Sequence, residues 1–274
     1  MDSLRSAAFF EKIKLFLLPA AFVGAMFGFA PEIYGQTSNA PARLRFEEPK
    51  FLQADIYSAD CKQVLFRFTR RATRTNNSLD VVRKYTYPDG KVAALERVIY
   101  NGDMLVSYTL EDLQSGASGS AIIKRSSNGQ EGIAFEYRKD PGAKQKSANE
   151  ELVPDTILAD MLAPFVVSHW KALMLGEKVK CRYIVVMRRE TVGFTFLKCA
   201  ESIKDGKPVV TIKMEPSSAI IGALIDPLFF TMEKDAPHHI LEYSGRTTPK
   251  VREGNSWKNL DGVTVFDWKT GSKP

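Results

Sequence analysis

The side chains that most often carry chemistry are few in this sequence. Of three histidines, His169 falls within an apolar stretch with helical spacing, and His238 and His239 follow Pro237 directly. Adjacent residues on a strand point to opposite faces, so His238 and His239 make a poor chelating pair. We therefore expect His169 to pack or hydrogen-bond in the core, and we assign no metal ligand.

Other motifs of enzymes are also lacking. The GASGS segment at 116–120 does not follow the strand-to-helix pattern of a nucleophile elbow, and Asp226 before Pro227 reads first as a helix stop. The sequence contains no dinucleotide-binding fingerprint, phosphate-binding loop or zinc spacing. These observations predict a protein that is not an enzyme, with no catalytic residue and no cofactor.

The three cysteines allow at most one disulfide within the chain. A hairpin is predicted over residues 179–199, apolar on both faces and therefore covered on both sides. With Glu190 at its centre, Cys181 lies opposite Cys199, at a separation that a disulfide can bridge. We expect this disulfide in an oxidising compartment, with a reduced buried pair as the alternative. Cys61 is then left free or pairs between chains.

The composition is that of an ordinary globular protein. Of 274 residues, 44% are hydrophobic and 26% are charged, which excludes a disordered or collagen-like chain. Lys and Arg number 38 against 32 Asp and Glu, giving a net charge of +6, and the excess is concentrated between Lys62 and Lys84. In an exported protein this basic segment favours contact with an anionic membrane surface rather than nucleic acid. The alternative is a solvated strand face.

The N-terminal segment indicates export. Residues 15–30 are uncharged and follow a weakly positive stretch, as in a secretory signal, so we assign residues 1–35 to a signal peptide and expect a periplasmic protein. Sixteen residues span about 24 Å as a helix, which is short for a membrane core of about 30 Å. The alternatives are an anchor in the inner membrane formed by residues 15–30, and a buried core helix.

The rest of the chain predicts a β domain with two helices. Residues 36–58 are assigned to a linker, and residues 59–270 to the domain. Six alternating segments joined by short turns lie between Val64 and Tyr137, and a second set begins at Val179. A long apolar helix is expected from Asp155 to Leu175, kinked or split at Pro164, and a short one at 219–225. The fold class is therefore mainly β: a curved antiparallel sheet, or half-barrel, of about 11–12 strands with both helices as a lid.

The second half of the domain carries a resemblance. The segments GEKVKCRYIVVMRRETVGFTF, GKPVVTIKMEP, DPLFF and HHILEYSGR between residues 176 and 246 resemble a family of exported bacterial β-proteins of unknown function. That family is similar in architecture to periplasmic lipoprotein and lipid carriers such as LolA. The resemblance implies a half-barrel with a helical lid and the binding of a hydrophobic ligand.

The leading hypothesis is therefore non-catalytic binding or shuttling of a lipid or lipid-like moiety, such as an acyl chain, in the cell envelope. The alternative is an envelope scaffold or interaction protein with a dry core. The oligomeric state is not indicated. The residues expected to line the ligand site are Leu158, Met161, Leu162, Phe165, Trp170, Phe194, Phe196, Ile221 and Leu224.

The export hypothesis gives a first testable prediction. Because the apolar run ends at Ala30, the mature protein purified from its native host should begin between about residues 31 and 43. N-terminal sequencing checks this. Full-length protein retained in the inner membrane would contradict cleavage and favour the anchor.

Overall fold

One curved sheet contains nearly all of the regular structure. The computed structural model describes residues 44–218, 222 and 225–268. Its sheet has 15 strands and is open, which confirms the predicted class of a mainly β, curved antiparallel fold with helices. The strands are β1 (Phe51–Tyr57), β2 (Val64–Thr75), β3 (Ser78–Thr86), β4 (Val92–Asn101), β5 (Met104–Asp112), β6 (Ala117–Arg125), β7 (Glu131–Arg138), β8 (Lys146–Glu151), β9 (Thr156–Ile157), β10 (Val179–Val185), β11 (Glu190–Lys204), β12 (Lys207–Pro216), β13 (Leu228–Glu233), β14 (Ile240–Glu253) and β15 (Ser256–Asp267).

The strand order follows the chain in two meanders. Strands β1 to β8 pair in sequence, β9 to β15 do the same, and β1 pairs with β15 to join the two sets. All pairs are antiparallel except β9 with β10. The free edges of the sheet are therefore β8 and β9, which are consecutive in the chain and separated by residues 152–155.

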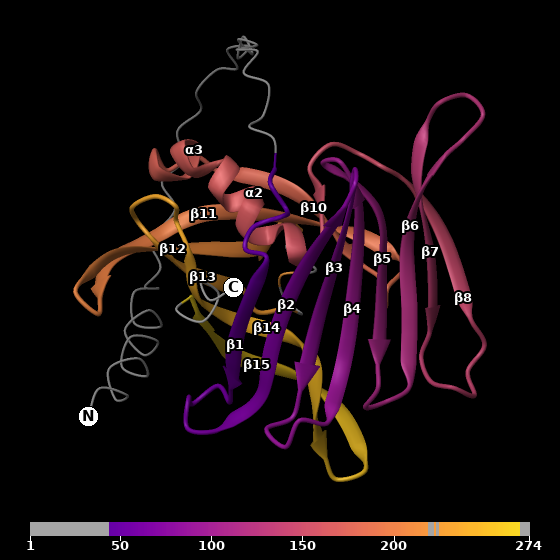
Figure 1. The fold of residues 1–274 in the computed structure, drawn as a ribbon, viewed down its shortest axis with the longest axis horizontal. Coiled ribbons are helices and arrows are strands. Elements are labelled where there is room, and N and C mark those ends of the chain that lie inside the picture. The colour runs from indigo at the N-terminus through magenta and orange to yellow at the C-terminus, as the bar shows by residue number, and fades with distance from the viewer. Residues whose placement is uncertain (1–43, 219–221, 223–224, 269–274) are drawn as a thin grey trace, which may run out of the picture. The chain divides into compact units, whose positions relative to one another are not determined.

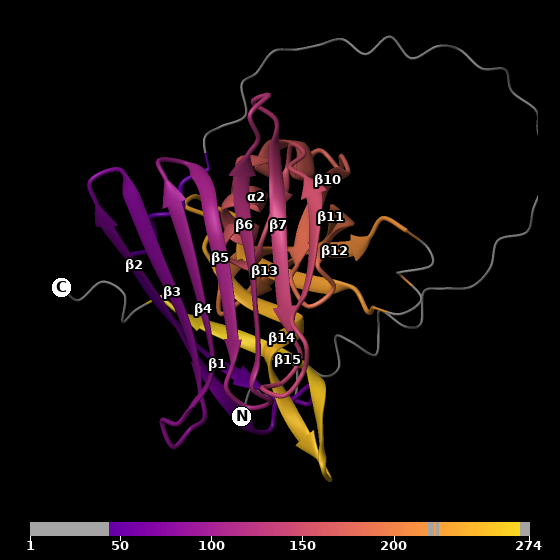
Figure 2. The same ribbon diagram turned by 90° about the vertical axis from the view of Figure 1, so that its right-hand side faces the viewer.

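The sheet curls until its two ends approach one another. Glu150 on β8 accepts hydrogen bonds from the backbone N–H and the hydroxyl of Thr191 on β11, both at 2.8 Å. A side chain on Gly119 of β6 would collide with Val186, which follows β10. Figures 1 and 2 show the result: β2–β7 form one wall and β10–β15 another, with the helices between them at one end.

The helices lie in the crossover segment, residues 152–178, which joins β8 to β10 and includes the short edge strand β9. It contains the 3-10 helix η1 (Ala159–Met161), α2 (Leu162–Ser168) and α3 (Trp170–Met174). Phe165 and Val166 of α2 are buried in one core cluster with Phe135 of the first wall and Phe196 of the second. Among the described residues, no helix is long and apolar enough to cross a membrane.

The prediction of one long helix from Asp155 was wrong. Asp155 has φ +57° in a turn and does not cap a helix, and Thr156–Ile157 pair as β9 because they bond to β10. The break falls at His169 rather than Pro164, since Pro164 sits in the first turn of α2, where its missing N–H costs no hydrogen bond. Gly176, with φ +83°, does end α3 as expected.

Three strands exceed the number predicted. Residues 51–57, assigned to the linker, form β1, whose Leu52, Ala54 and Ile56 are buried in alternation. This period-2 signal was present in the sequence and was overlooked. Strand β8 has the polar sequence KSANEE and exists because β7 supplies its hydrogen-bonding partners, as β10 does for β9. The predicted helix at 219–225 falls largely outside the described residues.

A buried ion pair holds the crossover segment against the first wall. Arg70 of β2 donates from Nε to Asp160 Oδ1 at 2.7 Å and from Nη2 to Asp160 Oδ2 at 3.1 Å. The Tyr100 hydroxyl donates to the same Oδ2 at 3.0 Å, and Arg70 also donates to the carbonyls of Phe46 and Pro49. Both charged side chains are almost fully buried. One guanidinium thus ties the start of the domain, β2 and η1 together.

Breaking this pair should be costly. We expect Asp160→Ala to lower the free energy of unfolding by about 3–5 kcal/mol, because Arg70 is left buried and unpaired. Urea denaturation followed by tryptophan fluorescence measures the change. Glu131→Gln, which removes the exposed partner of Arg125, is the matched control and should change it by about 1 kcal/mol or less. Equal effects in both variants would contradict the tether.

Candidate functional site

The concave face of the sheet brings together the predicted ligand-site residues that the structure describes. Phe194 and Phe196 project from β11, and the others lie at the start of the crossover segment or on its helices. All belong to, or pack against, a single core cluster. These residues are Leu158, Met161, Leu162, Phe165, Trp170, Phe194 and Phe196. Ile221 and Leu224 lie outside the described residues.

The apolar part of this face is closely packed in the structure. Leu158 and Phe165 are 1% exposed and Phe196 is fully buried. The Phe165 and Phe196 rings lie 5.4 Å apart, and Phe230 of β13 is 6.1 Å from Phe196. The helices therefore fill the concave face at this end rather than cover an open apolar groove.

A polar centre lies further along the same face. Arg83 Nη1 of β3 is 2.9 Å from Glu96 Oε2 of β4, and Glu96 is 2% exposed. Thr248 of β14 donates to Glu96 Oε1 at 2.6 Å, and the Tyr85 hydroxyl donates to Oε2 at 3.3 Å. Burial alone would lower the pKa of Arg83, but Glu96 beside it raises the pKa overall. The centre is thus a neutralised ion pair held by both walls.

Four tyrosines surround this ion pair. Tyr85 and Tyr108 come from the first wall, and Tyr183 and Tyr243 from the second. Burial raises the pKa of each phenol, and charges on neighbouring members of the group, Glu96 among them, contribute to the shifts. All four are therefore neutral hydrogen-bond donors at physiological pH and are unsuited to act as bases.

Two of these hydroxyls have no protein partner in the described part of the chain. Tyr85 donates to Glu96, and Tyr243 donates to the carbonyl of Arg246 at 2.6 Å. Tyr108 and Tyr183 hydrogen-bond to none of the described residues, although the charge of Glu96 adds to burial in raising the pKa of both phenols. Each of these two phenols can therefore donate one hydrogen bond to a ligand.

Sequence reasoning missed the polar centre and misjudged the basic segment that contributes to it. Arg70 and Arg83 lie in one cross-strand row with Glu96 on the concave face, where they are buried and paired. Other cations of the segment also meet carboxylates: Arg74 lies 3.0 Å from Glu47, and Lys62 lies 3.3 Å from Asp60. Strand alternation in the sequence does separate inward from outward residues, but it cannot show which side is filled.

The predicted disulfide was wrong because the hairpin register differs. Cys181 pairs with Phe194, and the turn lies before Glu190, which is itself paired with Val185. Cys199 falls at the irregularity between Lys198 and Ala200 and is exposed, whereas Cys181 is buried. All three cysteines are free.

The histidines form stacking contacts with aromatic rings. His169 Nδ1 lies 3.0 Å from the Phe165 carbonyl, which confirms the expected hydrogen-bonded position. His238 stacks on Trp170 of α3, and His239 stacks on Trp268, each with ring centroids 4.0 Å apart. His239 Nδ1 is also 2.9 Å from Glu233 Oε2. These stacks attach α3 and the C-terminal end of the described chain to the turn between β13 and β14.

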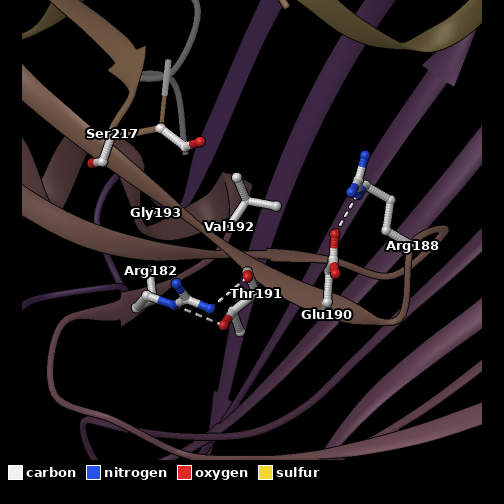
Figure 3. Close-up of a pocket in the computed structure, with 8 residues that line it drawn as sticks. Arg182, Arg188, Glu190, Thr191, Val192, Gly193 and Ser217 are labelled. Atoms are coloured by element: carbon white, nitrogen blue, oxygen red, sulfur yellow. Dashed lines mark hydrogen bonds and ion pairs between the residues drawn. The ribbon is translucent and has the colours of Figure 1, made fainter. Parts of the chain in front are cut away.

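A shallow pocket opens beside the β10–β11 hairpin (Figure 3). It has a volume of about 320 Å³, and its lining combines polar side chains with apolar surface. The lining residues are Arg182, Arg188, Glu190, Thr191, Val192, Gly193, Ser217 and Ser218. None of them was proposed as a site residue from the sequence.

A comparison with known protein families, curated proteins and solved structures finds no match to this chain.

The thiols provide a test of the register. Burial raises the pKa of Cys181 to about 12, so its reactive thiolate is scarce in the folded protein at pH 8. We expect iodoacetamide at pH 8 to modify exposed Cys199 well before Cys181, and all three cysteines in protein denatured without reductant. Peptide mass spectrometry measures both. A bridged Cys181–Cys199 peptide would contradict the observed pairing.

Proposed function

We propose that this protein binds a lipid or lipid-like hydrophobic moiety in the bacterial cell envelope without catalysing a reaction on it. The observation that carries the proposal is the pair of hydroxyls of Tyr108 and Tyr183, which lie near the buried Glu96 and make no hydrogen bond to a described residue. A ligand with an acceptor at its polar end would satisfy both hydroxyls.

The apolar end of such a ligand would replace the contacts that α2 and α3 make with the concave face of the sheet. Strand hydrogen bonds hold the sheet together, whereas Phe165 and Val166 of α2 join it through side-chain packing. Moving α2 and α3 therefore leaves the strand pairing of both walls intact. An acyl chain offsets the lost contacts by about 0.8 kcal/mol for each methylene that it buries. We take the structure to be the closed state.

An envelope scaffold with a dry core is the second candidate. The close packing of Leu158, Phe165 and Phe196 favours it. In that case the helices are permanent core elements and the sheet exposes no apolar groove at any time. The two candidates differ in whether the concave face takes up a ligand.

A fluorescent fatty acid, cis-parinaric acid, titrated into the delipidated full-length chain separates them. The proposal predicts saturable binding that Leu162→Asp weakens at least tenfold, because a carboxylate then enters the apolar site. Leu175→Asp adds the same charge at a side chain that is 70% exposed, and it should bind as the wild type does. Circular dichroism confirms that each variant is folded.

The polar end is tested by removing single hydroxyls. Tyr108→Phe and Tyr183→Phe should each weaken binding by roughly 3–10-fold, the value of one hydrogen bond. Tyr243→Phe, whose hydroxyl is already bonded to the Arg246 carbonyl, is the matched control and should leave binding unchanged. Absence of binding by the folded wild type would favour the scaffold.

A further inference from the structure

Gly193 occupies an unexpected place in the middle of β11. It pairs with Arg182 on β10 without a register shift, and on its other side, just beyond the end of β12, its carbonyl accepts a hydrogen bond from the Ser217 N–H at 2.9 Å. Its backbone does not adopt the left-handed conformation that favours glycine. Glycine weakens a strand interior, and where no bulge or bend requires it, it often marks close approach of a ligand or another backbone.

The space above Gly193 is bordered by hydrogen-bond donors. A Cβ at this position would lie 3.6 Å from Ser217 Oγ and 3.8 Å from Arg182 Nη1, which are ordinary contact distances. Figure 3 shows Arg182 and Ser217 on either side of Gly193 at the edge of the pocket. The face is the one opposite to the core, because the neighbouring Val192 and Phe194 point into the core cluster.

The guanidinium of Arg182 is held in a fixed position. Its Nε donates to Thr191 Oγ1 at 2.9 Å and its Nη2 donates to the Thr191 carbonyl at 2.6 Å. Thr191 is in turn held by Glu150 from β8. Within the described residues Nη1 makes no hydrogen bond, so it remains available to a ligand.

The other polar groups of the pocket complete a set of donors. Ser217 Oγ lies 3.0 Å from Thr195 Oγ1, so one hydroxyl can accept while the other donates onward. Arg188 is paired with Glu190 at the rim, and the lining therefore carries one net positive charge. An arginine whose fork is fixed, beside serine hydroxyls, matches the acceptors of a phosphate group.

We propose that the pocket over Gly193 binds a phosphate group, with Arg182 Nη1 and Ser217 Oγ as its donors. Gly193 keeps the space between them open, and the contact of Glu150 with Thr191 positions the arginine. This site lies on the face opposite to the concave one and does not depend on the proposed lipid binding.

The test is a titration of the full-length chain with inorganic phosphate, followed by the amide NMR resonances of Val192, Gly193 and Ser217. We expect saturable shifts at millimolar phosphate that an equal ionic strength of chloride does not produce. Arg182→Met should weaken binding at least tenfold. Arg125→Met, which removes one exposed cation elsewhere, is the matched control and should leave binding unchanged.

Gly193→Ala distinguishes a ligand site from a structural glycine. A methyl group meets no clash there, so the variant should melt at the same temperature as the wild type or higher while its phosphate affinity falls at least tenfold. sn-Glycerol 3-phosphate that binds more tightly than inorganic phosphate would identify a headgroup as the source, and equal affinities would identify free phosphate. Shifts that chloride reproduces, or full affinity in Gly193→Ala, would overturn the site.

Discussion

A sheet of 15 strands that curls on itself leaves a concave apolar face, and the rest of the structure depends on filling it. The crossover segment does so at one end. The chain passes from β8 to the opposite edge as β9, and the helices then connect β9 to its parallel neighbour β10, between the two walls. The buried Arg70–Asp160 pair fixes where they pass, since one guanidinium binds β2, η1 and the carbonyls before β1.

The other end is filled by polar contacts from β14. The register of β14 shifts between Arg246 and Lys250, which sends Thr248 to Glu96 and the ammonium of Lys250 to Asp112 at 2.8 Å. The Gln114 side-chain amide completes the junction: it donates to the Lys250 carbonyl and accepts from the Lys250 N–H. Buried charges are tolerated only where they are paired and hydrogen-bonded, so these contacts fix the separation of the walls.

The two faces of the sheet differ in chemistry at β11. Alternation along β11 sends Val192, Phe194 and Phe196 into the core and Thr191, Gly193 and Thr195 to the other side. The hydrogen bonds that Thr191 donates to Glu150 serve both sides, because they join the edge strand β8 to β11 and steady Arg182. A lipid-like ligand and a phosphate group would therefore use opposite faces of one strand.

The sequence by itself determined twelve of the strands, the β class and the apolar face of the crossover segment, because each depends on local periodicity. It could also have revealed β1, whose buried residues alternate. Tertiary structure alone decided the rest. Strands β8 and β9 exist because neighbours supply their hydrogen bonds, and a different turn position placed Cys181 opposite Phe194 rather than Cys199. The pairing of Arg83 with Glu96 and Thr248, and the open space over Gly193, join residues far apart in the chain. Such contacts arise from how the sheet curls, and local periodicity carries no information about that curvature.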